Sequence, residues 1–213
     1  ERSAFFLTML SIIFILFFTK KYKLIRLLCF TASVIVIVTK TIKNEALKDR
    51  MFLHPIKALT QTIEKKHVLT DVHDSLYKTS FKMFEQNKIL GIGPKMYRKH
   101  SRDERYQVGS SSFNTHPHNT YIQLLAETGL IGFAIFILFV ITFLFKTFLH
   151  FKNLLLKKNH LSDFSVCIMA AIFINIWPII PTGNFFNNWM SIVYYLPLGF
   201  YFSSLCQQEK SIY

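Results

Sequence analysis

The sequence contains few cysteines, and they form no pattern typical of a metal site or a disulfide framework. Cys29, Cys167 and Cys206 all lie inside apolar runs, so we expect them to be inert packing residues. Internal repeats and low-complexity tracts are also lacking. The first residue is not Met, and an apolar run follows almost at once. We therefore expect a piece of a longer membrane protein, for which no signal peptide can be assessed.

Acidic residues are scarce, with 12 Asp and Glu against 25 Lys and Arg and a net charge of +13. In a soluble protein this excess would indicate nucleic-acid binding. Here the basic residues flank apolar runs or lie in one central polar segment. Membrane topology and an anionic, lipid-linked partner explain that distribution better, so we expect no nucleic-acid partner.

Apolar residues, by contrast, are abundant and come in blocks. The chain is 51% hydrophobic and 16% aromatic, which is too apolar for an ordinary soluble domain. We predict an all-α integral membrane protein in contact with membrane lipids. Its expected transmembrane helices, about five, cover residues 4–18, 24–38, 121–148, 164–180 and 189–206. The first two runs are short for a span of roughly 20 residues.

The predicted organisation has four parts: a transmembrane helical hairpin (1–39), a large loop domain (40–119), three transmembrane helices (120–206) and a short tail (207–213). The loop domain is polar, and helix-like spacing recurs over residues 51–63 and 73–84. Glycines and a proline at 91–94 end the second of these helices, and serines at 110–112 indicate a loop. We expect a small, mostly helical domain outside the membrane.

Basic residues orient the predicted spans. Residues 20–26 and 146–160 carry four Lys or Arg each, and residues 181–188 carry none. Under the positive-inside rule the two basic turns are cytoplasmic. The loop domain, Arg2 and the Asn-rich turn at 181–188 then face the opposite side, which is the periplasm in a bacterium with two membranes.

A polar cluster at residues 115–132 joins the loop domain to the strongest apolar run. Asn119 directly follows His118, and Asn119, Gln123 and Glu127 are spaced four residues apart, so they share one helix face. Polar groups at such a position usually face a bundle interior or a wet cavity. A neutral imidazole there could accept a proton from a hydroxyl. The alternative is that Asn119 caps the helix and His118 is an ordinary loop residue. Glu127 would either orient the site through Gln123 or bond within the bundle.

Other features of this region favour structural roles. Gly129 and Gly132 are typical of close helix packing in membranes. His116 and His118 could form half of a zinc site, but the histidines at 54, 67, 73, 100 and 160 offer no matching ligand spacing, so we expect no metal. Three asparagines are expected to form a turn in preference to contacting sugar hydroxyls; they are Asn184, Asn187 and Asn188.

These residues resemble a known family. His118 and Asn119, then nine residues, then Gly129 and Gly132 form a pattern similar to the signature of the O-antigen ligase and O-antigen polymerase superfamily. Residues 1–4 are similar to that family's arginine-containing start of an earlier span. Residues 77–98 are similar to its segment ahead of the catalytic histidine. The resemblance covers most of the chain.

The resemblance implies a many-span, GT-C-like glycosyltransferase of the bacterial inner membrane with a periplasmic active site. Members move a glycan from undecaprenyl pyrophosphate to a hydroxyl acceptor, such as lipid A-core, in lipopolysaccharide biosynthesis. They use no metal or other cofactor. His118 matches the family's proposed general base, and Arg2 matches an arginine proposed to bind the diphosphate. Arginine suits that role because it forms charge-assisted, bidentate bonds to phosphate.

One position departs from the family pattern. His73 stands four residues before Tyr77, where members often carry an arginine. Arg50, Lys95 and Arg98 are candidates to supply the missing charge, although Arg50 and Lys95 also fit solvated surface positions. We expect His116 and Asn119 to contact substrate as well.

Two alternatives to a ligase stay open. A polymerase that joins repeat units on the carrier would share the donor chemistry and differ only in its acceptor. A non-enzymatic export or transporter subunit is less favoured, because the sequence indicates neither broken helices nor inverted repeats.

Overall fold

A computed structural model describes residues 2–53, 56–57, 60, 70–109, 112–158 and 161–210. Within these ranges the regular structure is entirely helical, which confirms the predicted all-α class. Contacts divide the chain into two compact units, Glu1–Thr70 and Asp71–Tyr213, which are described separately. The boundaries predicted after residues 39, 119 and 206 concern membrane topology and stay predictions.

The first unit is built on a helical hairpin. Helix α1 (Arg2–Phe18) and helix α2 (Lys23–Lys43) pack together, and Tyr22 closes the basic turn between them with a left-handed φ of 54°. The two helices form a hairpin, and its position in a membrane stays a prediction. Helix α3 (Glu45–Lys48) and a π-helix, η1 (Asp49–Leu53), follow. The helix predicted over 51–63 thus begins in η1, and most of it lies outside the described residues.

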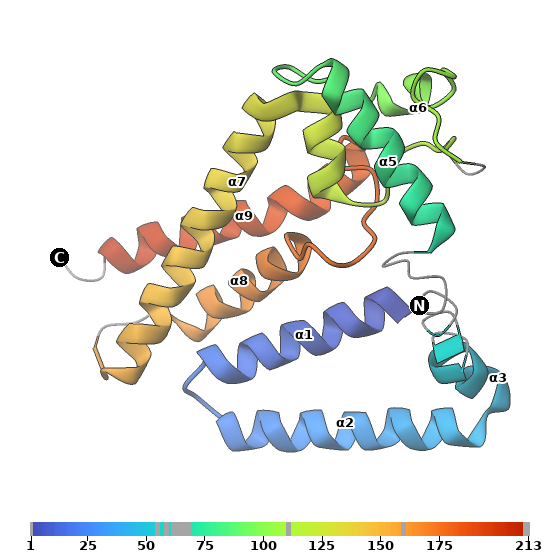
Figure 1. The fold of residues 1–213 in the computed structure, drawn as a ribbon. Helices are drawn as coiled ribbons and strands as arrows, with labels where there is room; N and C mark the ends of the chain where they lie inside the picture. The colour runs from blue at the N-terminus through green and yellow to red at the C-terminus, as the bar shows by residue number, and fades with distance from the viewer. Residues whose placement is uncertain are drawn as a thin grey trace. The chain divides into compact units, whose positions relative to one another are not determined.

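The second unit contains the 115–132 cluster. Its helices are α5 (Asp71–Gln86), α6 (Tyr97–His100), α7 (Thr120–Leu155), α8 (Asp163–Asn175) and α9 (Asn188–Lys210). Helix α5 packs against α7, and α8 against α9 (Figure 1). A small core joins α5, α6 and α7 through Met83, Tyr97, Tyr106 and Ala126, with Ile92 packed against it.

Helix α7 is broken at Gly129, whose φ of 62° and ψ of −163° are not helical, and the bend is visible in Figure 1. Residues 88–93 fill the break. Ile92 and Gly93 donate to the carbonyls of Ala126 and Glu127 at 3.0 and 2.9 Å. Leu130 N–H donates to the Lys88 carbonyl at 2.8 Å. The inserted loop therefore takes over hydrogen bonds that an unbroken helix would make with itself.

This break corrects two expectations. Gly129 does not serve helix–helix packing; it supplies a positive φ and lets the backbone of the 88–93 loop approach closely. Nor is the chain free of broken helices, so that argument against a transporter subunit fails.

Two described helices, α2 and α7, are long and apolar enough to cross a membrane, and few of their residues are buried. After the break, residues 130–155 extend for about 39 Å at about 1.5 Å per residue, which exceeds a hydrocarbon core of about 30 Å. Helix α8 ends at Asn175, well before the predicted residue 180, because Pro178 disfavours helical geometry in the residue before it. The count of five spans stays a prediction.

The cysteines correct a smaller expectation. All three side chains are exposed. They do not pack inside the described structure.

Candidate functional site

His118 occupies a sharp bend immediately before helix α7. Its φ is 57°, a left-handed conformation that costs a non-glycine residue about 1–2 kcal/mol. Pro117 on one side is fully buried. Asn119 on the other side caps the helix, because its Oδ1 accepts from Tyr121 N–H and Ile122 N–H at 3.0 and 3.1 Å. The surrounding structure therefore holds His118 in a costly backbone conformation.

Three imidazoles meet at this bend. The ring centroid of His118 lies 4.2 Å from that of His116 and 6.1 Å from that of His73 on α5. Tyr77, one turn further along α5, has its ring centroid 6.0 Å from that of His73. Three of the predicted site residues are thus brought together from two segments of the chain. Among the described residues, no group of three or more His, Cys, Asp or Glu side chains is arranged to hold a metal ion.

Hydrogen bonds define the tautomers of two imidazoles. Asn114 Oδ1 accepts from Thr115 N–H at 2.7 Å, so the Asn114 Nδ2 amine faces His118 Nε2, 3.2 Å away. An amide nitrogen only donates, so His118 Nε2 is the acceptor and Nδ1 carries the proton. His116 Nε2 faces the Thr182 carbonyl at 3.2 Å and must donate, while its Nδ1 accepts from Thr115 Oγ1 at 2.8 Å. Both nitrogens of His116 are therefore engaged.

The electrostatics favour neutral rings. Burial lowers the pKa of His118, and the neighbouring His73 lowers it further. Burial also lowers the pKa of His116, with a further contribution from His118 and an opposing one from the Thr182 carbonyl. Burial raises the pKa of Tyr77, against a hydrogen bond with Asn119. At neutral pH an unprotonated His118 with an acceptor at Nε2 can take a proton from a hydroxyl.

A loop between α8 and α9 fixes this arrangement from the other side. Thr182 N–H donates to the His118 carbonyl at 2.9 Å, and Thr120 Oγ1 donates to Thr182 Oγ1 at 3.0 Å. Asn119 Nδ2 donates to the Pro178 carbonyl at 2.8 Å. Both ends of the Asn119 amide are thus used within the protein. Asn119 therefore caps the helix, which was the alternative considered from the sequence, and its contact with substrate stays a prediction.

The polar face of α7 runs into the protein interior. Gln123 and Glu127 are both fully buried. Gln123 Nε2 donates to Glu127 Oε2 at 2.9 Å and to Asn184 Oδ1 at 2.8 Å. Glu127 Oε1 accepts from Tyr97 N–H at 2.7 Å. The stripe predicted from the spacing therefore exists, and it bonds to two loops.

The asparagine-rich loop has the expected turn chemistry. Asn184 Oδ1 accepts from Phe186 N–H, and Asn187 Oδ1 from Trp189 N–H, both at 3.0 Å. Asn188 Oδ1 accepts from Lys95 Nζ at 3.1 Å.

The predicted cations are less closely grouped. Arg98 is exposed on α6, and Lys95 is exposed just before it. Arg2 begins α1, and Arg50 is exposed on η1; both belong to the first unit. Their part in a site with His118 stays a prediction. Asn114 and Thr182 were missed in the sequence, although Asn114 lies only four residues before His118.

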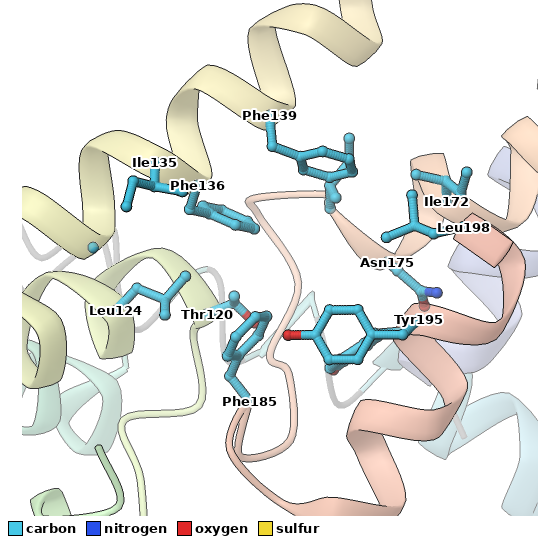
Figure 2. A pocket seen from close by; sticks show the side chains of 13 residues that line it. Thr120, Leu124, Ile135, Phe136, Phe139, Ile172, Asn175, Phe185, Tyr195 and Leu198 are labelled. Carbon is cyan, nitrogen blue, oxygen red and sulfur yellow. The ribbon is translucent and has the colours of Figure 1, made fainter. Parts of the chain in front are cut away.

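The second unit also contains an apolar pocket, whose lining includes none of the three histidines. Its volume is about 300 Å³. Thr120, two residues after His118, lies on its wall, and Figure 2 shows Phe136 and Phe139 of α7 lining it together with Phe185 and Tyr195. A chain-like apolar ligand fits such a lining better than a sugar does.

Fold and site together define a helical protein that has two described helices long and apolar enough to cross a membrane. Its second unit holds a half-buried group of three histidines, of which His116 and His118 have lowered pKa values, and an apolar pocket that begins at Thr120. Residues 1–137 match the family model described as O-Antigen ligase. The chain belongs to this family, and its function is therefore of the O-antigen ligase or polymerase type. The match covers the whole histidine cluster and the break at Gly129. No curated protein and no solved structure matches the chain.

Proposed function

We propose that this chain forms part of a metal-independent glycosyltransferase of the bacterial inner membrane. The enzyme transfers a glycan from undecaprenyl pyrophosphate to a hydroxyl of lipid A-core or a similar acceptor, with its site on the periplasmic side. The single observation that carries this proposal is the neutral His118, whose Nε2 accepts a hydrogen bond and whose backbone is held in a left-handed bend.

In the proposed reaction the acceptor hydroxyl replaces the Asn114 amide as the partner of His118 Nε2. The proton passes to Nε2 as the acceptor oxygen attacks the anomeric carbon. The bond between that carbon and the diphosphate breaks, and the diphosphate leaves with the electron pair. General-base catalysis of this kind contributes about 10²–10⁴ in rate.

The leaving diphosphate needs positive charge. Arg2, Arg98, Arg50, Lys95 and His73 are the proposed contacts, and Arg2 and Arg98 offer the planar, bidentate geometry. The apolar pocket beside Thr120 is the proposed place for part of the carrier's isoprenoid chain. Its lining of aromatic and aliphatic side chains supports this assignment.

The test uses membranes that contain the full-length protein, a carrier-linked glycan donor and lipid A-core. His118→Ala should lower transfer by about 10²–10⁴ without lowering the amount of inserted protein. Wild-type transfer by this variant would overturn the proposal.

A polymerase is the second candidate, because the family match covers both reaction types. The same donor, offered with either lipid A-core or a second carrier-linked glycan, distinguishes the two by which acceptor is elongated. A non-enzymatic export or transporter subunit is the third candidate, favoured by the broken helix α7. It predicts no new glycosidic bond with either acceptor.

A further inference from the structure

Gln123 and Glu127 form a buried polar pair for which the proposed chemistry has no use. Both side chains are fully buried on the part of α7 before the break. The two side chains have four oxygen and nitrogen atoms between them, and each atom has a partner. The Glu127 oxygens accept from Tyr97 N–H and from Gln123 Nε2, which also donates to Asn184 Oδ1, and Gln123 Oε1 accepts from Phe185 N–H. Burying a carboxyl group is costly unless its hydrogen bonds are made. Apolar residues would pack here at lower cost.

The partners of the pair belong to two different loops. Tyr97 N–H, bound by Glu127, opens α6, so the bond fixes the segment that carries Lys95 and Arg98. Phe185 N–H donates to Gln123 Oε1 at 3.0 Å, which fixes the loop after Thr182. That loop also bonds to the His118 carbonyl and to His116.

A further bond links the same two loops directly, from Lys95 Nζ to Asn188 Oδ1 at 3.1 Å. The contacts therefore close a ring that runs from α7 through Glu127 to the 95–98 segment, across to the 182–188 loop, and back to α7 through Gln123. Helix α7 begins two residues after His118, so this ring sets the position of two cationic side chains relative to the imidazole cluster.

We propose that Glu127 and Gln123 are positioning residues, which hold the Lys95–Arg98 segment and the 182–188 loop in register with His118. This inference rests on the proposed function, because it assigns the segment to the donor's diphosphate. Neither residue is a catalytic residue, since both are fully buried and act only through the loops they hold. Displacing a charged group by about 1 Å can cost about a hundredfold in rate.

Glu127→Gln is the sharpest variant. The side-chain oxygen of the new glutamine can still accept from Tyr97 N–H. Its amide NH2 group, however, faces the amide NH2 group of Gln123, so two donors oppose each other. The double variant Gln123→Glu/Glu127→Gln restores a donor–acceptor pair between the two side chains. Glu104→Gln, which changes an exposed carboxylate, is the matched control.

Two measurements on the full-length protein in nanodiscs test the proposal. The first is amide hydrogen exchange over residues 95–100, which requires no activity. The second is transfer kinetics with the carrier-linked donor. In Glu127→Gln we expect faster exchange in this segment, a donor KM raised about tenfold and a kcat lowered up to about a hundredfold. The pH at which activity falls on the acid side should not change, because His118 keeps its own partners.

The double variant should recover part of both effects, and the control should change neither. Wild-type exchange in Glu127→Gln would overturn the inference, as would faster exchange without a change in donor KM or kcat. A fall in the amount of folded protein with normal KM and kcat would mean a structural role only, and would also overturn it. Wild-type transfer by a His118→Ala variant would contradict the proposed function instead. The hydrogen-exchange result does not depend on activity, so the two failures can be told apart.

Discussion

Gly91 and Gly129 meet backbone to backbone where the loop after α5 enters the break in α7. A Cβ on either glycine would lie 2.6 Å from the amide nitrogen of the other. Both residues have positive φ values, 69° and 62°. The break in α7, which separates the segment with Gln123 and Glu127 from the long apolar segment, therefore depends on two glycines, Gly91 and Gly129.

The first prediction is that Gly129→Ala strongly destabilises the second unit. The positive φ combined with the extended ψ of −163° costs a residue other than glycine about 1–3 kcal/mol, and the clash with the loop backbone adds to it. We expect a loss of at least about 2 kcal/mol in the free energy of unfolding, measured by denaturant unfolding in detergent.

Gly199→Ala is the matched control for this variant. Gly199 lies inside α9, and a Cβ added there would meet no neighbouring group within 4 Å. Alanine is also the better helix former by about 0.5–1 kcal/mol, so this variant should be neutral or stabilising. Equal stability of the Gly129→Ala and Gly199→Ala variants would contradict the close approach of the two backbones.

The second prediction concerns pH. The pKa of His118 is lowered by burial and by His73, and the base works only when unprotonated. Transfer should therefore rise with pH and reach half of its maximum below about pH 6.5, the ordinary value for histidine. His73→Phe keeps the site buried but removes a neighbouring charge, so the acid limb of the profile should move to higher pH. The measurement is kcat/KM against pH.

His116 and His73 pack against His118, and Tyr77 packs against His73, so the control must avoid all three. His100→Phe changes a histidine that packs against Tyr106 in the same unit and should leave the profile unchanged. An acid limb that stays in place in His73→Phe would mean that His118 is not the titrating base.

The third prediction is that Asn114 sets the protonation of His118. In Asn114→Asp one oxygen still accepts from Thr115 N–H, and the other faces His118 Nε2 as an acceptor. The carboxylate then favours a proton on Nε2 and raises the pKa of the imidazole. We expect transfer at neutral pH to fall by about tenfold or more and the acid limb to move to higher pH.

Asn114→Ala separates this electrostatic effect from simple loss of the side chain. It removes the hydrogen bond to His118, worth about 1 kcal/mol, and those that Asn114 Oδ1 accepts from Thr115, but it adds no charge. We therefore expect a loss of about fivefold in kcat and a much smaller shift of the acid limb. Identical pH profiles for the Asp and Ala variants would contradict the assigned tautomer.

Some of this structure follows from the sequence and some does not. Apolar blocks and basic turns predicted α1, α2 and α7 because their signals are local. The spacing of Asn119, Gln123 and Glu127 predicted a polar face, because residues four apart share one side of a helix. Their partners in the 178–188 loop lie far along the chain, and no local pattern indicates such pairings. The break at Gly129 was missed because a glycine in an apolar helix is also typical of close packing.

The last prediction tests the join between α7 and the 178–188 loop. Asn119 uses Oδ1 to cap the helix and Nδ2 to hold the Pro178 carbonyl, so two variants separate its tasks. Asn119→Asp keeps the cap and loses the donor; Asn119→Ala loses both. Loss of a cap costs about 1 kcal/mol, and loss of the hydrogen bond to the carbonyl of Pro178, an exposed residue, costs about 1 kcal/mol. We therefore expect both variants to lose stability and the alanine variant to lose about 1 kcal/mol more, measured by denaturant unfolding in detergent. Both variants of Asn119 should also lose transfer activity, because Thr182 in the same loop holds the His118 carbonyl. We expect this loss in Asn119→Asp even though Asp retains the helix cap. Full activity in Asn119→Asp would show that the loop is not needed to hold His118 in place.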